Sequence, residues 1–175
     1  MSAYYHELQS FRKPVFWIIM SIALLPIIGI MLYGCYKQLV LGEVWGNKPI
    51  SDVALIIITL IVVILTLTIT WFVFNLELIV EIKNKQVHYK LRPIFSEKVI
   101  HFSELESWVI EPISPIIQFG GYGWRVTPKS KAFIINGKNA LFLKPKEGKK
   151  IVLDTINPIE LKAFLDKEWQ RFKEY

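Results

Sequence analysis

Residues 53–76 read VALIIITLIVVILTLTITWFVFNL, and residues 77–92 follow directly as ELIVEIKNKQVHYKLR. The first stretch is uncharged, and seventeen of its residues are Leu, Ile, Val or Phe. It exceeds the ~20 residues with which a helix crosses a hydrocarbon core. In the second stretch apolar side chains alternate with charged ones, as in a half-buried β-strand. The junction at Glu77 therefore predicts a transmembrane helix that runs directly into a β domain.

A second uncharged run, residues 14–36, lies upstream between Lys13 and Lys37. It is also long enough to span a bilayer as a helix, and Pro26 predicts a bend because proline removes one helical hydrogen bond. The sequence thus divides into a membrane anchor and a following domain. The anchor is residues 1–76, with transmembrane helices at about 14–36 and 53–76, and the domain is residues 77–175.

The first apolar run has two alternative interpretations. A cleaved signal peptide has a shorter apolar region and a small-residue cleavage site, and this run has neither feature. The stretch Leu32-Tyr33-Gly34-Cys35 has some likeness to a lipoprotein processing box, which would make Cys35 a lipid carrier. The bulky Tyr33 and the late position in the chain argue against lipidation. A small residue near the end of a helix is the preferred interpretation of Cys35.

Basic residues beside the apolar runs predict the orientation of the chain. The connection between the runs has only Lys37 and Lys48. Six basic residues flank the other ends: Arg12, Lys13, Lys83, Lys85, Lys90 and Arg92. Because short cytoplasmic flanks carry the excess of Lys and Arg, both termini are expected in the cytoplasm and the connection outside. We therefore expect a multi-pass protein of the inner (plasma) membrane.

The net charge limits the possible partners of the domain. The chain has 21 Lys and Arg against 15 Asp and Glu, and residues 77–175 hold 17 and 12 of these. Such a modest surplus suits an anionic leaflet, and it suits simple solubility equally well. Nucleic acid is not an expected partner, because the surplus is small and no basic strand rich in aromatic residues is present.

Alternating apolar and polar residues after position 76 predict a mainly β fold with about seven antiparallel strands. The strands are expected at residues 77–83, 87–92, 97–102, 107–111, 131–136, 139–144 and 149–154. Hairpin turns are expected at 84–85, 136–137 and 147–148, and a long connection rich in Gly and Pro at 112–128.

A C-terminal helix is expected to close this domain. Asn157 is a good N-cap and Pro158 fits the first helical position. Leu161, Phe164 and Leu165 then form an apolar stripe, which we expect to be buried against the strands.

Two stretches of the domain carry a resemblance to a known family. They are GGYGWR at residues 120–125 and the segment from Asn136-Gly137 through Lys149 to TINPIEL at residues 155–161. Together with the order of elements, they resemble the pleckstrin-homology (PH) superfold, and in particular the PH-like domains that follow one or two transmembrane helices in bacterial membrane proteins. The resemblance covers roughly residues 76–175. It implies membrane-proximal binding or assembly, since this fold mostly hosts binding functions.

One group of basic residues is the candidate ligand site. Lys83, Lys85, Lys90 and Arg92 surround the first predicted hairpin and are similar to the arrangement with which many PH domains hold inositol phosphates. Several donors that converge from a hairpin can satisfy a multiply charged phosphate. The two-residue turn is shorter than such a pocket needs, so a solvated face is the first interpretation, contact with anionic headgroups the second and a specific phosphate ligand the third.

A second basic set and the scattered histidines have less specific interpretations. Lys144, Lys146, Lys149 and Lys150 surround another predicted hairpin. The histidines, His6, His88 and His101, have no paired Cys or Asp nearby in sequence and are interpreted as surface residues.

No pattern in the sequence indicates an enzyme. The glycine-rich residues 120–125 match no phosphate-binding loop or dinucleotide fingerprint, and no catalytic motif is present. One cysteine allows no internal disulfide and, with scattered histidines, no zinc cluster. No cofactor or metal is therefore expected. The leading hypothesis is a scaffold or accessory subunit that binds a protein partner or its own copy, and the alternative is a sensor of anionic lipid headgroups.

Overall fold

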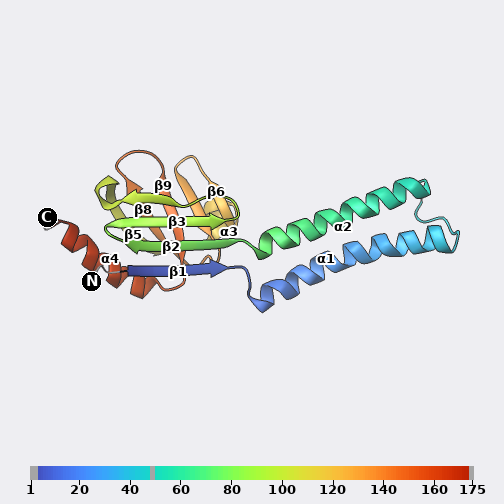
Figure 1. The fold of residues 1–175 in the computed structure, drawn as a ribbon, viewed down its shortest axis with the longest axis horizontal. Helices are drawn as coiled ribbons and strands as arrows, with labels where there is room; N and C mark the ends of the chain where they lie inside the picture. The colour runs from blue at the N-terminus through green and yellow to red at the C-terminus, as the bar shows by residue number, and fades with distance from the viewer. Residues whose placement is uncertain (1–3, 48–49, 174–175) are drawn as a thin grey trace. The chain divides into compact units, whose positions relative to one another are not determined.

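A computed structural model describes residues 4–47 and 50–173, and these fall into two compact units (Figure 1). One unit is helical and comprises residues 12–74. The other, the β domain, joins residues 4–11 to residues 75–173. The sequence predicts an anchor of residues 1–76. In the structure, residues 4–11 belong to the β domain instead.

The helical unit consists of two long apolar helices, as predicted. α1 (Pro14–Cys35) continues into a π-helical turn, η1 (Tyr36–Val40), and α2 (Asp52–Phe74) returns. Both are long and apolar enough to cross a membrane. The start of α1 and the end of α2 lie together, because the Arg12 guanidinium stacks 4.8 Å from the centre of the Phe74 ring. Thr59 is buried, and its Oγ1 lies 3.2 Å from the Cys35 Sγ, so this side chain packs between the two helices.

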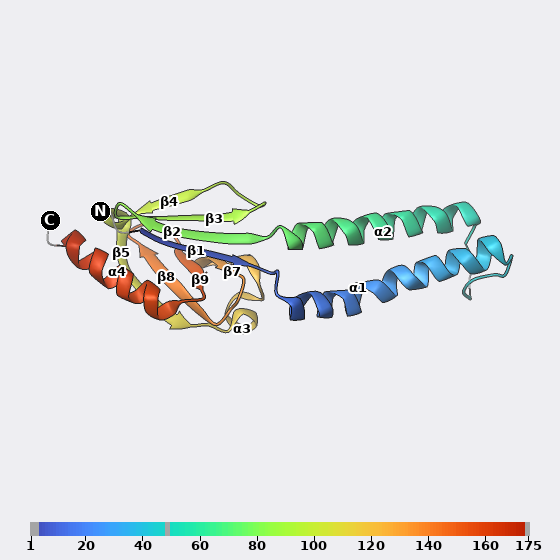
Figure 2. The same cartoon turned by 60° about the horizontal axis from the view of Figure 1, so that its bottom comes forward.

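In the β domain the described residues form nine strands in two sheets (Figures 1 and 2). The first sheet has the order β1-β2-β3-β4 and the second the order β5-β8-β9-β7-β6. The strands are β1 (Tyr4–Ser10), β2 (Glu77–Lys83), β3 (Gln86–Arg92), β4 (Lys98–His101), β5 (Leu105–Pro112), β6 (Gly123–Val126), β7 (Ser130–Ile134), β8 (Asn139–Pro145) and β9 (Lys150–Thr155). A short 3₁₀ turn, η2 (Phe102–Glu104), joins the sheets, α3 (Pro115–Phe119) precedes β6, and α4 (Pro158–Lys173) closes the chain.

The seven predicted strands and the C-terminal helix are confirmed to within a few residues at each end. The turn at Asn84-Lys85 is also confirmed, and both residues have the positive φ angles of a tight hairpin turn. β1, β6 and α3 were not predicted. β6 and α3 lie inside residues 112–128, which the sequence had indicated only as a connection.

Two features of the predicted topology are wrong. The strands are not all antiparallel, since β7 and β9 pair in parallel. Asn136-Gly137 does not close a hairpin, because β9 lies between β7 and β8. The reason is that the Asp154 side chain on β9 accepts hydrogen bonds from the backbone N–H groups of Ile135 and Gly137. These bonds attach the turn at Asn136-Gly137 to β9, which separates β7 from β8.

The larger of two buried apolar clusters lies between the two sheets and α4. Alternation in β2 sends Leu78, Val80 and Ile82 inward, and each is at most 2% exposed. Leu161 and Leu165 of α4 are buried as predicted, whereas Phe164 is only partly buried and packs 5.7 Å, centre to centre, from the ring of Tyr5. The helix thus closes the core beside β1.

Substitution of Leu165 tests this role of α4. Leu165 is 1% exposed, so Leu165→Ala should lower the free energy of unfolding by about 2–5 kcal/mol through lost burial and a residual cavity. The control is Ile159→Ala on the same helix, where the side chain is 86% exposed and the expected change is within about 0.5 kcal/mol. Urea unfolding of the full chain in mild detergent measures both, and equal effects would show that α4 is peripheral.

Candidate binding surface

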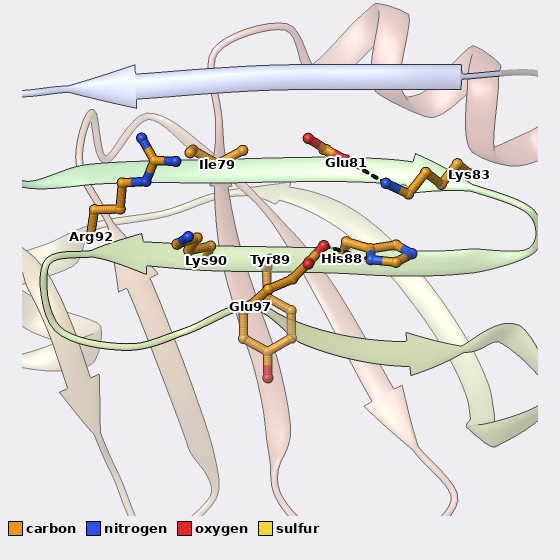
Figure 3. A pocket seen from close by; sticks show the side chains of 8 residues that line it. All are labelled: Ile79, Glu81, Lys83, His88, Tyr89, Lys90, Arg92 and Glu97. Atoms are coloured by element: carbon orange, nitrogen blue, oxygen red, sulfur yellow. Dashed lines mark hydrogen bonds and ion pairs between the residues drawn. The ribbon is translucent and has the colours of Figure 1, made fainter.

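The outer side of β2 and β3 carries the candidate residues of the sequence analysis. Because the buried side chains of these strands alternate with outward ones, a second row faces away from the core. We call this row the β2–β3 face, and it consists of Ile79, Glu81, Lys83, His88, Lys90 and Arg92. With Tyr89 and Glu97 at its margin, it lines an open hollow of about 270 Å³ (Figure 3).

The four basic candidates do not converge on one point. Lys83 lies opposite Gln86, next to the hairpin turn, whereas Arg92 lies opposite Glu77 at the other end of the strands. The two pairs lie six residue steps apart along β2, so the backbone distance between them is about 20 Å at ~3.4 Å per residue. Lys85 lies in the turn itself, with its Nζ 5.9 Å from the centre of the Phe172 ring on α4. One phosphate group therefore cannot contact both Lys83 and Arg92.

Acidic side chains of β2 lie beside the basic ones on this surface. Lys83 Nζ lies 2.9 Å from Glu81 Oε2, and this hydrogen bond raises the pKa of Lys83 and lowers the pKa of Glu81. Arg92 lies 3.9 Å from Glu77. These partly exposed pairs add little stability, but they cancel much of the positive charge that an anionic ligand would meet.

The histidines take part in surface hydrogen bonds. His88 Nδ1 lies 2.7 Å from Glu97 Oε1 at the edge of the hollow (Figure 3). His101 Nδ1 lies 3.2 Å from the side-chain Nε2 of Gln86. Among the described residues no group of three or more His, Cys, Asp and Glu side chains is placed to hold a metal ion.

The second basic set is also spread around its hairpin. Lys144 pairs with Glu106 at 2.8 Å, and Lys149 donates to the Thr127 carbonyl oxygen at 2.9 Å. These side chains bind different neighbours of the β8–β9 hairpin and do not surround one ligand.

Comparison with known proteins assigns no family to this chain. No family model, no curated protein and no solved structure matches it.

A buried polar cluster joins β1 to the second sheet, and the sequence analysis missed it. Glu7 is only 5% exposed, and its carboxyl group accepts hydrogen bonds from the Thr155 hydroxyl at 2.8 Å and the Ile156 N–H at 2.6 Å. The Tyr5 hydroxyl and the Gln9 amide also donate to it. Burial, together with the neighbouring Glu7, raises the pKa of Tyr5. We call this set, with Asn136 and Asp154, the Glu7 cluster.

Gln9 and Asp154 extend the cluster to the turn after β7. Gln9 Nε2 donates to the Asp154 carbonyl oxygen at 2.7 Å, and its Oε1 accepts from Asn136 Nδ2 at 2.9 Å. The Asp154 side chain is 1% exposed and binds three backbone N–H groups through Oδ2, while Oδ1 has no hydrogen-bond partner in the described part of the chain. Burial raises the pKa of Asp154 even though these N–H groups oppose the shift.

The sequence of β1 has the two-residue period of a strand, but polar residues occupy its buried face and an apolar residue its exposed face. Tyr5, Glu7 and Gln9 alternate with Tyr4 and Leu8, which is a strand period. The buried positions, however, include the two polar residues, and the outward ones include Leu8. A search for alternating apolar residues therefore could not identify the inner face of this strand.

The raised pKa of Asp154 predicts a specific pH dependence of stability. Between the ordinary Asp value of ~4 and the raised pKa of the folded chain, Asp154 holds a proton that the unfolded chain has lost, so the free energy of unfolding falls as the pH rises through this window. Asp154→Asn cannot titrate. The stability advantage of the original chain over this variant should therefore grow as the pH is lowered from 7 toward 4, measured by urea unfolding.

Asp166→Asn is the matched control for the change in net charge, because Asp166 is exposed on α4. A difference between the original chain and Asp154→Asn that stays constant with pH, or grows as the pH rises, would contradict the role assigned to burial.

Proposed function

We propose that this chain is a membrane-anchored scaffold or accessory subunit, and that its PH-like β domain binds a protein partner or a second copy through the β2–β3 face. The observation that carries the proposal is the mixture of basic and acidic side chains around the open hollow on that face. Such a surface is complementary to another patterned protein surface, where opposite charges fix register and orientation.

The membrane anchor is supported by both units of the structure. α1 and α2 have the length and composition of spanning helices. β1 precedes α1, β2 follows α2, and these two strands pair with each other, with Ser10 opposite Glu77. Both flanks of a spanning helical pair would therefore lie on the same side of the membrane. The flanking excess of Lys and Arg favours the cytoplasmic side of a bacterial inner membrane.

A PH-like plan is supported by two sheets around one core and by the helix that closes it. The domain departs from the antiparallel plan in its parallel β7–β9 pair, and β1 comes from the other side of the helical unit in sequence. These departures affect the second sheet and the edge of the first. The β2–β3 hairpin, which presents the proposed binding face, keeps the expected form.

A protein partner fits the β2–β3 face better than a uniformly anionic membrane does. Anionic headgroups would attract Lys83, Lys90 and Arg92 but repel the acidic side chains between them. A protein can present both signs of charge at the matching positions. The ~20 Å spread of the basic residues also suits an extended protein contact and not a single phosphate.

Sensing of anionic headgroups is the second candidate, and one observation favours it. Lys90 and Arg92 lie on the half of β3 that pairs with the start of β2, close in sequence to the end of α2. If α2 spans the membrane, these two residues are the members of the group that the anchor holds nearest to a leaflet, where each would contribute roughly 1 kcal/mol.

Photo-crosslinking in cells tests the protein-binding function. A photo-crosslinking amino acid at position 83 should give a discrete adduct with one protein or with a second copy of the chain. Lys90→Glu with Arg92→Glu should abolish the adduct and leave the amount of chain in the membrane fraction unchanged, because the helices supply the anchoring. Lys146→Glu with Lys149→Glu makes the same charge change on another hairpin and should preserve the adduct.

Selective binding to anionic headgroups would contradict the protein-binding function. If position 83 gives no protein adduct and the chain binds anionic vesicles selectively, and if the first charge reversal abolishes that binding, the sensor function replaces the scaffold. Salt separates the two attractions as well, because headgroup attraction weakens as the Debye length shortens.

A further inference from the structure

α3 and the residues after it form an uncharged, exposed apolar segment on a domain that is otherwise highly charged. No charged residue occurs between Glu111 and Arg125. The two central residues of α3, Ile116 and Ile117, are 71% and 88% exposed. Tyr122 and Trp124 follow and are each more than 40% exposed. Contiguous exposed apolar side chains of this kind mark an interaction surface.

Hydrogen bonds and packing place this segment beside the end of β1. Asn136 binds the side chain of Gln9, near the end of that strand. The next residue, Gly137, packs so closely on Pro115 of α3 that a Cβ at this glycine would lie 2.4 Å from the proline ring. Figures 1 and 2 agree with this placement, since α3 lies at the end of the β domain where β1 ends and β2 begins.

The chain leaves the β domain for the helical unit at this same end. β1 ends at Ser10 and α1 begins at Pro14, while α2 ends at Phe74 and β2 begins at Glu77. A connection of three residues reaches ~10 Å at most. If the helices span a bilayer, both connections hold this end of the β domain at the membrane–water interface.

We propose that Ile116 and Ile117 insert into the boundary between headgroups and acyl chains, so that α3 acts as an interfacial contact in addition to the spanning helices. The inference rests on the proposed membrane anchoring and is independent of what the β2–β3 face binds. The chemistry fits a lipid surface: the segment is uncharged, isoleucine partitions into the apolar layer, and Tyr and Trp prefer the interface.

A second copy of the chain is a weaker occupant for this segment. A stable protein interface buries about 800 Å² on each partner, and a helix of five residues offers only a small part of that area. The segment also lies beside both connections to the helices, where a leaflet would be closer to it than another β domain.

Fluorescence quenching in lipid nanodiscs tests the inference with the full chain. In a Cys35→Ser background, an environment-sensitive probe is attached at Ile117→Cys and, as the control, at Glu147→Cys. Glu147 is exposed in the β8–β9 hairpin, and β8 runs from Asn139, near α3, to Pro145 at the opposite end of the strand. The quenchers are spin-labelled lipids in the disc and iodide in the buffer.

We expect the probe at position 117 to be quenched at least twofold more by spin-labelled lipid, and at least twofold less by iodide, than the probe at 147. The difference should persist in discs of neutral phosphatidylcholine, because the contact is apolar. A companion Ile116→Glu substitution should restore iodide access at 117, whereas Ile159→Glu, at another highly exposed isoleucine on α4, should not.

The failures are distinguishable. If the chain does not incorporate into nanodiscs, the membrane anchor fails, and this inference fails with it. If the chain incorporates but both probes respond alike, or if the lipid quenching requires anionic phosphatidylglycerol, the anchor stands and the apolar insertion of α3 is overturned. Iodide protection at 117 without lipid quenching, combined with chemical crosslinking between chains, would assign the segment to a second copy.

Discussion

The Glu7 carboxyl group holds together parts of the chain that are far apart in sequence. It binds the Thr155 hydroxyl at the end of β9 and the Ile156 N–H that follows, while Tyr5 and Gln9 donate to it from its own strand. β1 precedes the two apolar helices and every other strand follows them. The β domain therefore closes only when a segment from before the helical unit pairs with β2 and places this side chain inside.

Burying a carboxyl group to set the register of a strand costs free energy. Removal from water is unfavourable, and only a full set of donors offsets the cost. The four donors around Glu7 meet this condition, and the two that lie outside β1, the Thr155 hydroxyl and the Ile156 N–H, would lose their partner if β1 shifted by one residue. A one-residue slip would also turn Glu7 and Gln9 outward. The Glu7 cluster thus specifies the register of an edge strand that has few apolar side chains to do so.

The sequence predicted the elements whose inner faces are apolar. β2 and β3 alternate cleanly, their turn has a tight-hairpin sequence, and α4 has a proper N-cap and a leucine stripe, so all of them were located correctly. β1 was missed because its buried face is polar. The parallel pairing of β7 and β9 could not be read from the sequence either, since Asn136-Gly137 has the composition of a hairpin turn and only the bonds to Asp154 reveal its other role.

The candidate site was also predicted only in part. The sequence correctly indicated that Lys83, Lys90 and Arg92 belong to one hairpin, but the four basic residues seemed close only because they are near in sequence. The strand register separates Lys83 from Arg92, and acidic side chains from neighbouring positions interrupt the positive surface. Specificity on this face, if it binds a protein, depends on the positions of both signs of charge.

The pairing of β1 with β2 implies that the β domain is one folding unit built from both sides of the helical unit. Replacing residues 12–74 with a short glycine-containing turn tests this, since Ser10 and Glu77 are already neighbours across β1 and β2. We predict a water-soluble protein that unfolds in one cooperative transition, whereas residues 75–175 alone, without β1, unfold at a much lower urea concentration. Equal midpoints for the two proteins would contradict the claim and show that β1 is dispensable.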